Sequence, residues 1–166
     1  MDYSHLIDDV KTVQIQDAYK RLVPIAKETE KDYLQQVFYS QEYAIATNAH
    51  ILVILRLNEN LGEREFTVPT TSFHKTDDTF VTTDAGLQII CDHKTDKSGD
   101  YGFGDVDKFP NVDKVIPDKI KDKNQSQQLL NGEYVGIVTQ AITGDKNKVR
   151  LHFNGEKNPA YISGEY

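Results

Sequence analysis

The sequence has one cysteine and no long apolar run. With Cys91 as its single thiol, the chain cannot form an internal disulfide, which is typical of proteins of a reducing cytoplasm. The longest apolar stretch is 51–55, much shorter than the roughly 20 residues that cross a bilayer. The first residues lack the basic and apolar segments of a secretion signal. These absences predict a cytoplasmic protein without a membrane partner.

An excess of basic residues is also missing. The chain has 19 Lys and Arg against 26 Asp and Glu, and its formal net charge is −7. That charge disfavours unspecific coating of nucleic acid, because phosphates are attracted by cations. The net charge does not exclude DNA binding by one basic face, because a phosphate responds to the local electrostatic potential of that face.

Motifs that perform catalysis or hold cofactors are absent as well. The segment 102–105 lacks the lysine and hydroxyl of a phosphate-binding loop, and no Gly-x-Ser-x-Gly elbow occurs. The five histidines show no pair at the i,i+4 spacing of a helical zinc site. We therefore expect no catalytic residue, cofactor or metal, and a binding protein rather than an enzyme. An active site assembled only in three dimensions is the lesser alternative.

Two amphipathic helix patterns enclose a series of strand patterns. The first helix is predicted over 17–30, capped by Asp17 and kinked or restarted at Pro24. The second is predicted over 131–142. Strands rich in β-branched and aromatic residues are predicted over 33–39, 42–47, 51–57, 66–68, 79–83, 87–93, 149–153 and 160–162. This order predicts an α+β fold with antiparallel sheets and two amphipathic helices.

One segment is similar to a motif of the bacterial DNA sliding clamp, the β subunit of DNA polymerase III. Residues 43–52, Tyr-Ala-Ile-Ala-Thr-Asn-Ala-His-Ile-Leu, resemble the clamp's strand-turn-strand motif ATDGHRL. Thr47, His50 and Leu52 match that motif. Asn48 replaces its aspartate, Ala49 its glycine and Ile51 its arginine.

Two further segments resemble the same family, in the same order along the chain. Residues 109–117, Phe-Pro-Asn-Val-Asp-Lys-Val-Ile-Pro, are close to the clamp's linker motif FPDYRRVIP. Residues 131–135, 148–155 and 158–159 resemble its last half-domain. The resemblance implies a DNA-clamp-like fold, with a clamp-like domain over 1–117 and a linker plus half-domain over 118–166, packed as one compact unit.

In sliding clamps, helices line a ring and offer cations to the DNA backbone, independently of base sequence. The resemblance gives this role to four residues of the first helix region: Lys20, Arg21, Lys27 and Lys31. The second helix departs from the family, because no Lys or Arg occurs over 131–144. The alternative for the four residues is an ordinary solvated helix face.

The resemblance also implies an apolar pocket for short peptides of polymerases and repair proteins. Its matching residues are Thr47, Ala49, His50, Ile51, Leu52, Pro110, Lys114, Val115 and Ile162. We expect Phe109 to be buried and to anchor the linker, leaving Val115 beside Leu52. The alternative is that these residues only close the core between sheet and linker.

The sequence thus predicts a compact, clamp-like accessory protein of DNA replication, of phage or mobile-element type. Because one domain cannot close a ring, encircling duplex DNA would require a homo-oligomer. The alternative is a monomeric clamp-derived adaptor that binds peptides without encircling DNA. The basic residues of the first helix favour the ring, whereas the lack of Lys and Arg in the second helix favours the adaptor.

Overall fold

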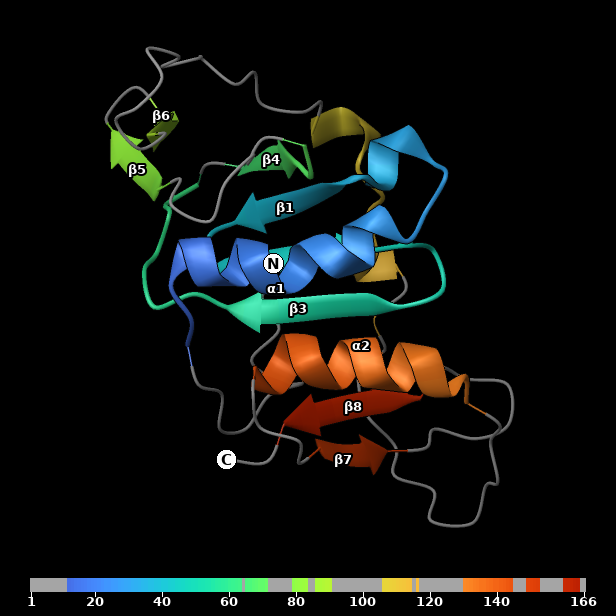
Figure 1. Ribbon diagram of the computed structural model, residues 1–166. Coiled ribbons are helices and arrows are strands. Elements are labelled where there is room, and N and C mark those ends of the chain that lie inside the picture. The colour runs from blue at the N-terminus through green and yellow to red at the C-terminus, as the bar shows by residue number, and fades with distance from the viewer. Residues whose placement is uncertain are drawn as a thin grey trace.

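The computed structural model of the protein describes residues 12–63, 65–71, 79–83, 86–90, 106–114, 116, 130–144, 149–152 and 160–164. These residues form an α+β fold of antiparallel strands with two α-helices and three short 3₁₀-helices (Figure 1). Along the chain, the described elements are α1 (Ile15–Lys27), η2 (Asp32–Leu34), β1 (Gln36–Ser40), β2 (Tyr43–Thr47), β3 (Leu52–Arg56), β4 (Glu65–Pro69), β5 (Thr79–Thr83), β6 (Gly86–Ile90), η3 (Val106–Lys108), η4 (Val112–Lys114), α2 (Gly132–Thr143), β7 (Val149–His152) and β8 (Tyr161–Gly164).

The main sheet has the strand order β3-β2-β1-β4, and all its pairs are antiparallel. The first three strands form the predicted meander, and β4 returns to the free side of β1. Every residue of β1 and β2 is buried. A sheet whose central strands are buried on both faces needs a cover on each side.

Helix α1 covers one face of this sheet (Figure 1). Ala18, Leu22, Ile25 and Ala26 recur at helical spacing and are all fully buried there, as the sequence predicted. The Tyr19 hydroxyl donates a 2.6 Å hydrogen bond to the carbonyl of Pro69 at the end of β4. Helix α1 is therefore held to the sheet by apolar packing and by a side-chain bond.

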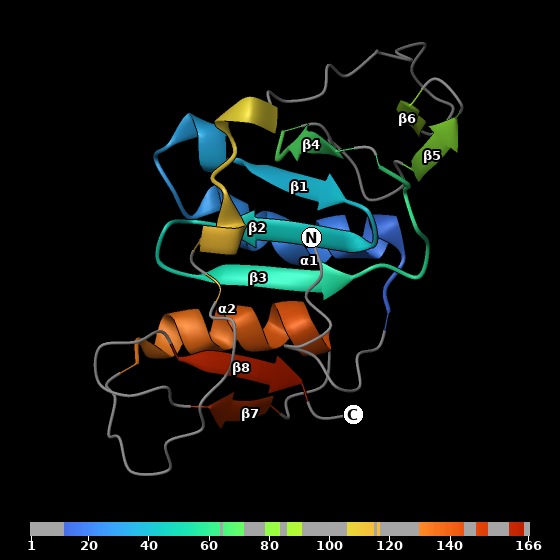
Figure 2. The ribbon, with the colours of Figure 1, turned by 180° about the vertical axis from the view of Figure 1, so that it is seen from behind.

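Residues 106–114 and 116 cover the other face, as the view from behind shows (Figure 2). Phe109 stacks on Phe38 of β1 with ring centroids 5.0 Å apart, and it packs in one cluster with Tyr43, Ile45 and Val112. The prediction that Phe109 is buried and anchors this segment is confirmed.

Helix α2 lies beside α1, and β8 packs against α2 (Figures 1 and 2). Val138 and Ala141 of α2 belong to the same hydrophobic cluster as the buried face of α1. The side chain of Asn131 caps α2 by accepting a 3.0 Å hydrogen bond from the amide of Glu133. The predicted helix over 131–142 is thus confirmed to within one residue at each end.

Helix α1 differs from the prediction at its start, at Pro24 and at its end, which is Lys27 where residue 30 was predicted. Asp17 does not cap it, because the helix begins at Ile15 after Gln14, which makes no side-chain cap. The earlier start follows from the burial of Ile15 in the core. Pro24 does not restart the helix, which runs unbroken to Lys27 with Pro24 on its exposed side.

The strand predicted over 33–39 begins later, at Gln36. Residues Asp32–Leu34 form a 3₁₀ turn instead, in which the Leu34 amide donates to the Lys31 carbonyl. Leu34 is buried, so this turn anchors the connection from α1 into β1. The pairing of 79–83 with the following strand is confirmed, while the predicted turn at 84–86 falls largely outside the described residues.

Candidate functional site

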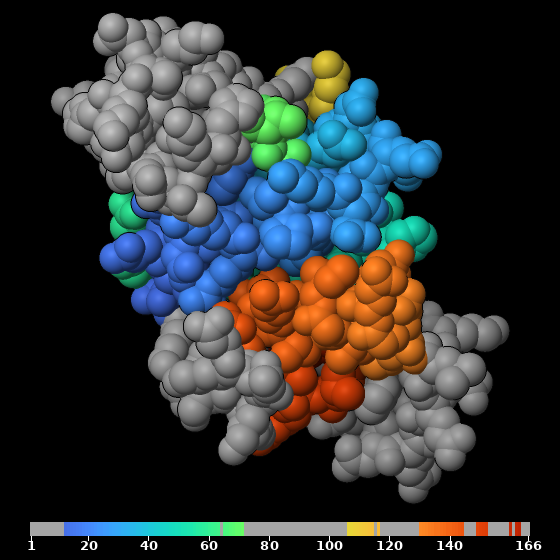
Figure 3. Space-filling view, viewed as in Figure 1, coloured from blue at the N-terminus to red at the C-terminus, as the bar shows by residue number. Residues whose placement is uncertain are grey.

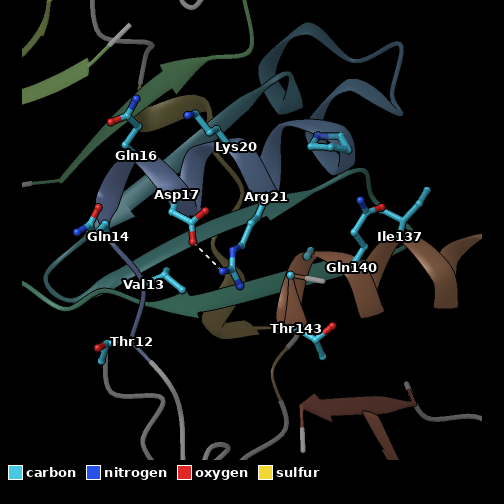
Figure 4. A pocket seen from close by; sticks show the side chains of 13 residues that line it. Thr12, Val13, Gln14, Gln16, Asp17, Lys20, Arg21, Ile137, Gln140 and Thr143 are labelled. Atoms are coloured by element: carbon cyan, nitrogen blue, oxygen red, sulfur yellow. Dashed lines mark ion pairs between the residues drawn. The ribbon is translucent and has the colours of Figure 1, made fainter. Parts of the chain in front are cut away.

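A groove of about 850 Å³ lies where the start of α1 meets the end of α2 (Figure 4). Its walls come from 12–24 on the side of α1 and from 137–144 on the side of α2. The two helices run side by side across one face of the molecule (Figure 3). The lining mixes apolar side chains with polar ones, among them Gln16 and Lys20 on one wall and Gln140 on the other.

Arg21 links the two walls. Its Nη2 lies 2.7 Å from a carboxylate oxygen of Asp17, and its Nη1 donates a 3.4 Å hydrogen bond to the carbonyl of Ile142. Gly144 ends α2 with φ of +66°, and a Cβ built there would be 3.3 Å from Nη2. The guanidinium therefore lies over the C-terminal end of α2, where the helix dipole favours a cation.

The structure places the four residues predicted to contact DNA at different positions. Lys20 and Arg21 both line the groove, and Lys20 is exposed. Lys27 is the exposed last residue of α1, and Lys31 is exposed beyond the helix, before η2. Arg21 already has Asp17 as its counter-ion, so its charge is compensated within the chain.

The turn between β2 and β3 is closed by two side chains. The Asn48 side-chain oxygen accepts 2.9 Å hydrogen bonds from the amides of His50 and Ile51. The Thr47 hydroxyl accepts from the amide of Ala49 and donates to the carbonyl of Ile51. Ala49 adopts φ of +77°, a conformation that favours glycine.

His50 joins this turn to α2 by stacking on Tyr134, with ring centroids 5.8 Å apart. The residues after it alternate between two clusters. Ile51 packs against the cluster of α1 and α2, as does Ile162 of β8, whereas Leu52 packs against the cluster that holds Phe109. The residues predicted to bind peptides thus divide between the two faces of the sheet.

Three of the residues predicted to bind peptides belong to the linker, and the structure describes two of them. Pro110 and Lys114 are exposed on the segment that carries Phe109. Val115 lies outside the described residues. The exposed linker and the half-buried Leu52 therefore share one face of the sheet, and Ile51 and Ile162 do not belong to it.

The sequence did not predict the groove, nor that Arg21 connects its two walls. The i,i+4 spacing of Asp17 and Arg21 is a signal of an ion pair on a helix. The contact between Arg21 and Ile142 joins residues 121 apart, and no local pattern predicts it. Gln140 was missed because an amide on a helix carries no signal for a binding site.

Among the residues that the structure describes, no group of three or more His, Cys, Asp or Glu side chains has the arrangement of a metal site. Within the same residues, no helix has the length and apolar character needed to cross a bilayer. Comparisons with protein-family models, curated proteins and solved structures find no match to this chain. The class defined by the fold is an α+β chain built on an antiparallel sheet, and the likeness to sliding clamps stands on the three sequence motifs.

Proposed function

We propose that the protein is a clamp-like accessory protein of DNA replication, which binds duplex DNA as a homo-oligomer and docks partner peptides. The observation that carries the proposal is the helix pair: α1 and α2 lie side by side on one face, and each is followed along the chain by antiparallel strands. The four-stranded sheet follows α1 and the two-stranded sheet of β7 and β8 follows α2, and the sequence motifs imply a clamp-like domain and a half-domain for these two parts. The exposed Lys20 and Lys27 of α1 supply cations for the DNA backbone.

Such contacts give weak, sequence-independent binding for one protomer. Each phosphate that a lysine neutralises releases a counter-ion and contributes about 0.9 to the salt slope. Two lysines on one helix offer few such contacts, so useful affinity requires several protomers on the same duplex. The oligomer is therefore part of the proposal, and symmetric closure is its simplest form.

The test is fluorescence anisotropy with two short duplexes of unrelated sequence, between about 50 and 200 mM salt. Lys20→Glu and Lys27→Glu are expected to weaken binding equally for both duplexes. Each substitution should also lower the salt slope by about one. Lys108→Glu is the matched control, since it makes the same charge change on the opposite face of the sheet, in η3. If the wild-type protein does not bind either duplex at low salt, the ring proposal is wrong.

A second candidate is the monomeric adaptor, and the charges of the helix pair favour it. Arg21 is paired with Asp17, and α2 has Glu133 as its charged residue and no cation. In this case, partner peptides would dock near Leu52 and the exposed linker residues Pro110 and Lys114. Burying two or three apolar peptide side chains, each contributing roughly 1.5–3 kcal/mol before ordering costs, gives micromolar affinity.

The adaptor is tested by titrating a labelled clamp-binding peptide into the protein. Val115→Asp should abolish binding while the circular dichroism spectrum stays native. A peptide with its apolar residues replaced by serine is the control. Light scattering then separates the two candidates, because the adaptor remains at the monomer mass of 18.9 kDa with and without DNA. Peptide binding that survives Val115→Asp would assign these residues to the core alone.

A further inference from the structure

We propose that Arg21 is an anion-responsive latch between α1 and α2. In this proposal, a phosphate group bound in the groove takes the guanidinium away from Asp17 and from the end of α2. It rests on the proposed function in one respect, because DNA phosphates are the expected source of the anion.

The latch is defined by three contacts of one guanidinium. They are the 2.7 Å ion pair with Asp17, the 3.4 Å hydrogen bond to the Ile142 carbonyl and the close approach to Gly144. Figure 4 shows Arg21 extending from α1 towards the end of α2, beside Thr143. The side chain therefore connects parts of the chain that are 121 residues apart in sequence.

Each of these contacts is weak enough for an anion to displace. The side chains of Arg21 and Asp17 are 25% and 45% exposed, and exposed i,i+4 ion pairs contribute little to stability. The bond to Ile142 is near the upper limit of hydrogen-bond length. A phosphate accepts two parallel hydrogen bonds from a guanidinium and is the stronger partner. Lys20 lines the same groove and adds a second cation for the incoming anion.

Release of Arg21 affects a limited part of α2. Val138 and Ala141 remain buried against α1, so the body of the helix keeps its position. The last turn loses the bond at Ile142 and the cover over Gly144, and its amides then exchange with solvent more readily. Anion binding in the groove is thereby coupled to the end of α2.

The experiment follows the arginine side-chain Nε signals by NMR together with the amide exchange of residues 142–144. The probes are inorganic tripolyphosphate and a short DNA duplex at low salt. The Arg21 signal should shift with either probe, and exchange at 142–144 should become about fivefold faster. Arg56, which pairs with Glu42 at 3.0 Å on the main sheet, is the internal control and should not shift.

Two variants separate the latch from a purely structural role. Arg21→Lys keeps the charge but lacks the forked donors, so exchange at 142–144 should already be fast without a probe and should not increase further. Lys20→Gln should raise the tripolyphosphate concentration needed to shift Arg21, with no effect on exchange in its absence.

Each outcome bears on the latch or on DNA binding separately. If tripolyphosphate shifts Arg21 but the duplex does not bind, the latch stands and the proposed DNA function fails. If the duplex binds while Arg21 and the exchange at 142–144 stay unchanged, the latch is wrong and the DNA function stands. If neither probe binds, both are wrong.

Discussion

Replacing Ala49 by glycine should make this protein more stable. Ala49 adopts φ of +77° in the turn between β2 and β3. The hydrogen bonds of Thr47 and Asn48 to the backbone of residues 49–51 hold it there. A left-handed conformation costs a residue with a Cβ roughly 1–2 kcal/mol. Glycine avoids this cost, and Ala49 is exposed, so little packing is lost with its methyl group.

The gain is smaller than the strain because glycine also makes the unfolded chain more flexible, which opposes folding by about 0.4–1 kcal/mol. The difference leaves a net stabilisation of about 0.5–1 kcal/mol. For a chain of this length, that corresponds to a rise in Tm of about 1–4 °C. In urea it corresponds to a midpoint about 0.3–0.5 M higher, with the slope of the transition unchanged.

Urea unfolding followed by circular dichroism measures this effect. Gly62→Ala is the mirror-image control, since Gly62 has φ of +73° and no atom lies within 4 Å of a Cβ built there. That substitution introduces the same strain without any steric contact, so it should destabilise the protein by about 1 kcal/mol. An Ala49→Gly protein less stable than the wild type, together with the expected loss for Gly62→Ala, would refute the argument from backbone strain.

Two further predictions concern the two faces of the main sheet. Phe109→Ala removes the ring that stacks on Phe38. It should lower the free energy of unfolding, measured in urea, by about 3–4 kcal/mol. A loss below about 1 kcal/mol would show that Phe109 does not anchor its segment to the sheet. Burial raises the pKa of Tyr19, and also that of Tyr39, above the ordinary value of 10.0. The stability that their neutral phenols provide is complete below the unfolded pKa and is lost as the pH rises above about 10. Tyr19→Phe should lower the free energy of unfolding by about 1 kcal/mol at neutral pH, because the hydrogen bond to the Pro69 carbonyl is lost. The variant should also lose less stability than the wild type as the pH rises above about 10. Equal losses of stability in the wild type and the variant would contradict this second expectation.

The sequence predicts the helices and the meander well because their signals are local. The apolar spacing of each helix acts within a few residues, and both helices appear within three residues of their predicted bounds. The start of α1 was misjudged because a residue suited to capping, Asp17, outweighed the burial of Ile15. That burial depends on the sheet, which local propensity does not contain.

The candidate site was less predictable because it depends on contacts between distant segments. The return of β4 to β1 and the approach of α2 to α1 are matters of topology, and no spacing along the chain encodes them. The neutralisation of Arg21 follows from that topology together with Asp17. A cation counted in the sequence as available for DNA thus proves to be engaged within the protein.

If the protein binds DNA as proposed, the pairing of Arg21 makes the salt dependence of binding a measure of how many protomers assemble on one duplex. If Arg21 stays paired and phosphates contact the exposed Lys20 and Lys27, one protomer neutralises about two phosphates. The expected salt slope is then about −2 for a monomer and about −4 or steeper for two or more protomers on the same duplex. If a DNA phosphate releases Arg21, each protomer makes about three phosphate contacts where it otherwise makes about two. The salt slope then becomes steeper by about half. The slope of the Arg21→Gln variant should accordingly equal that of the wild type if the guanidinium stays on α2, and should be shallower if phosphates capture it.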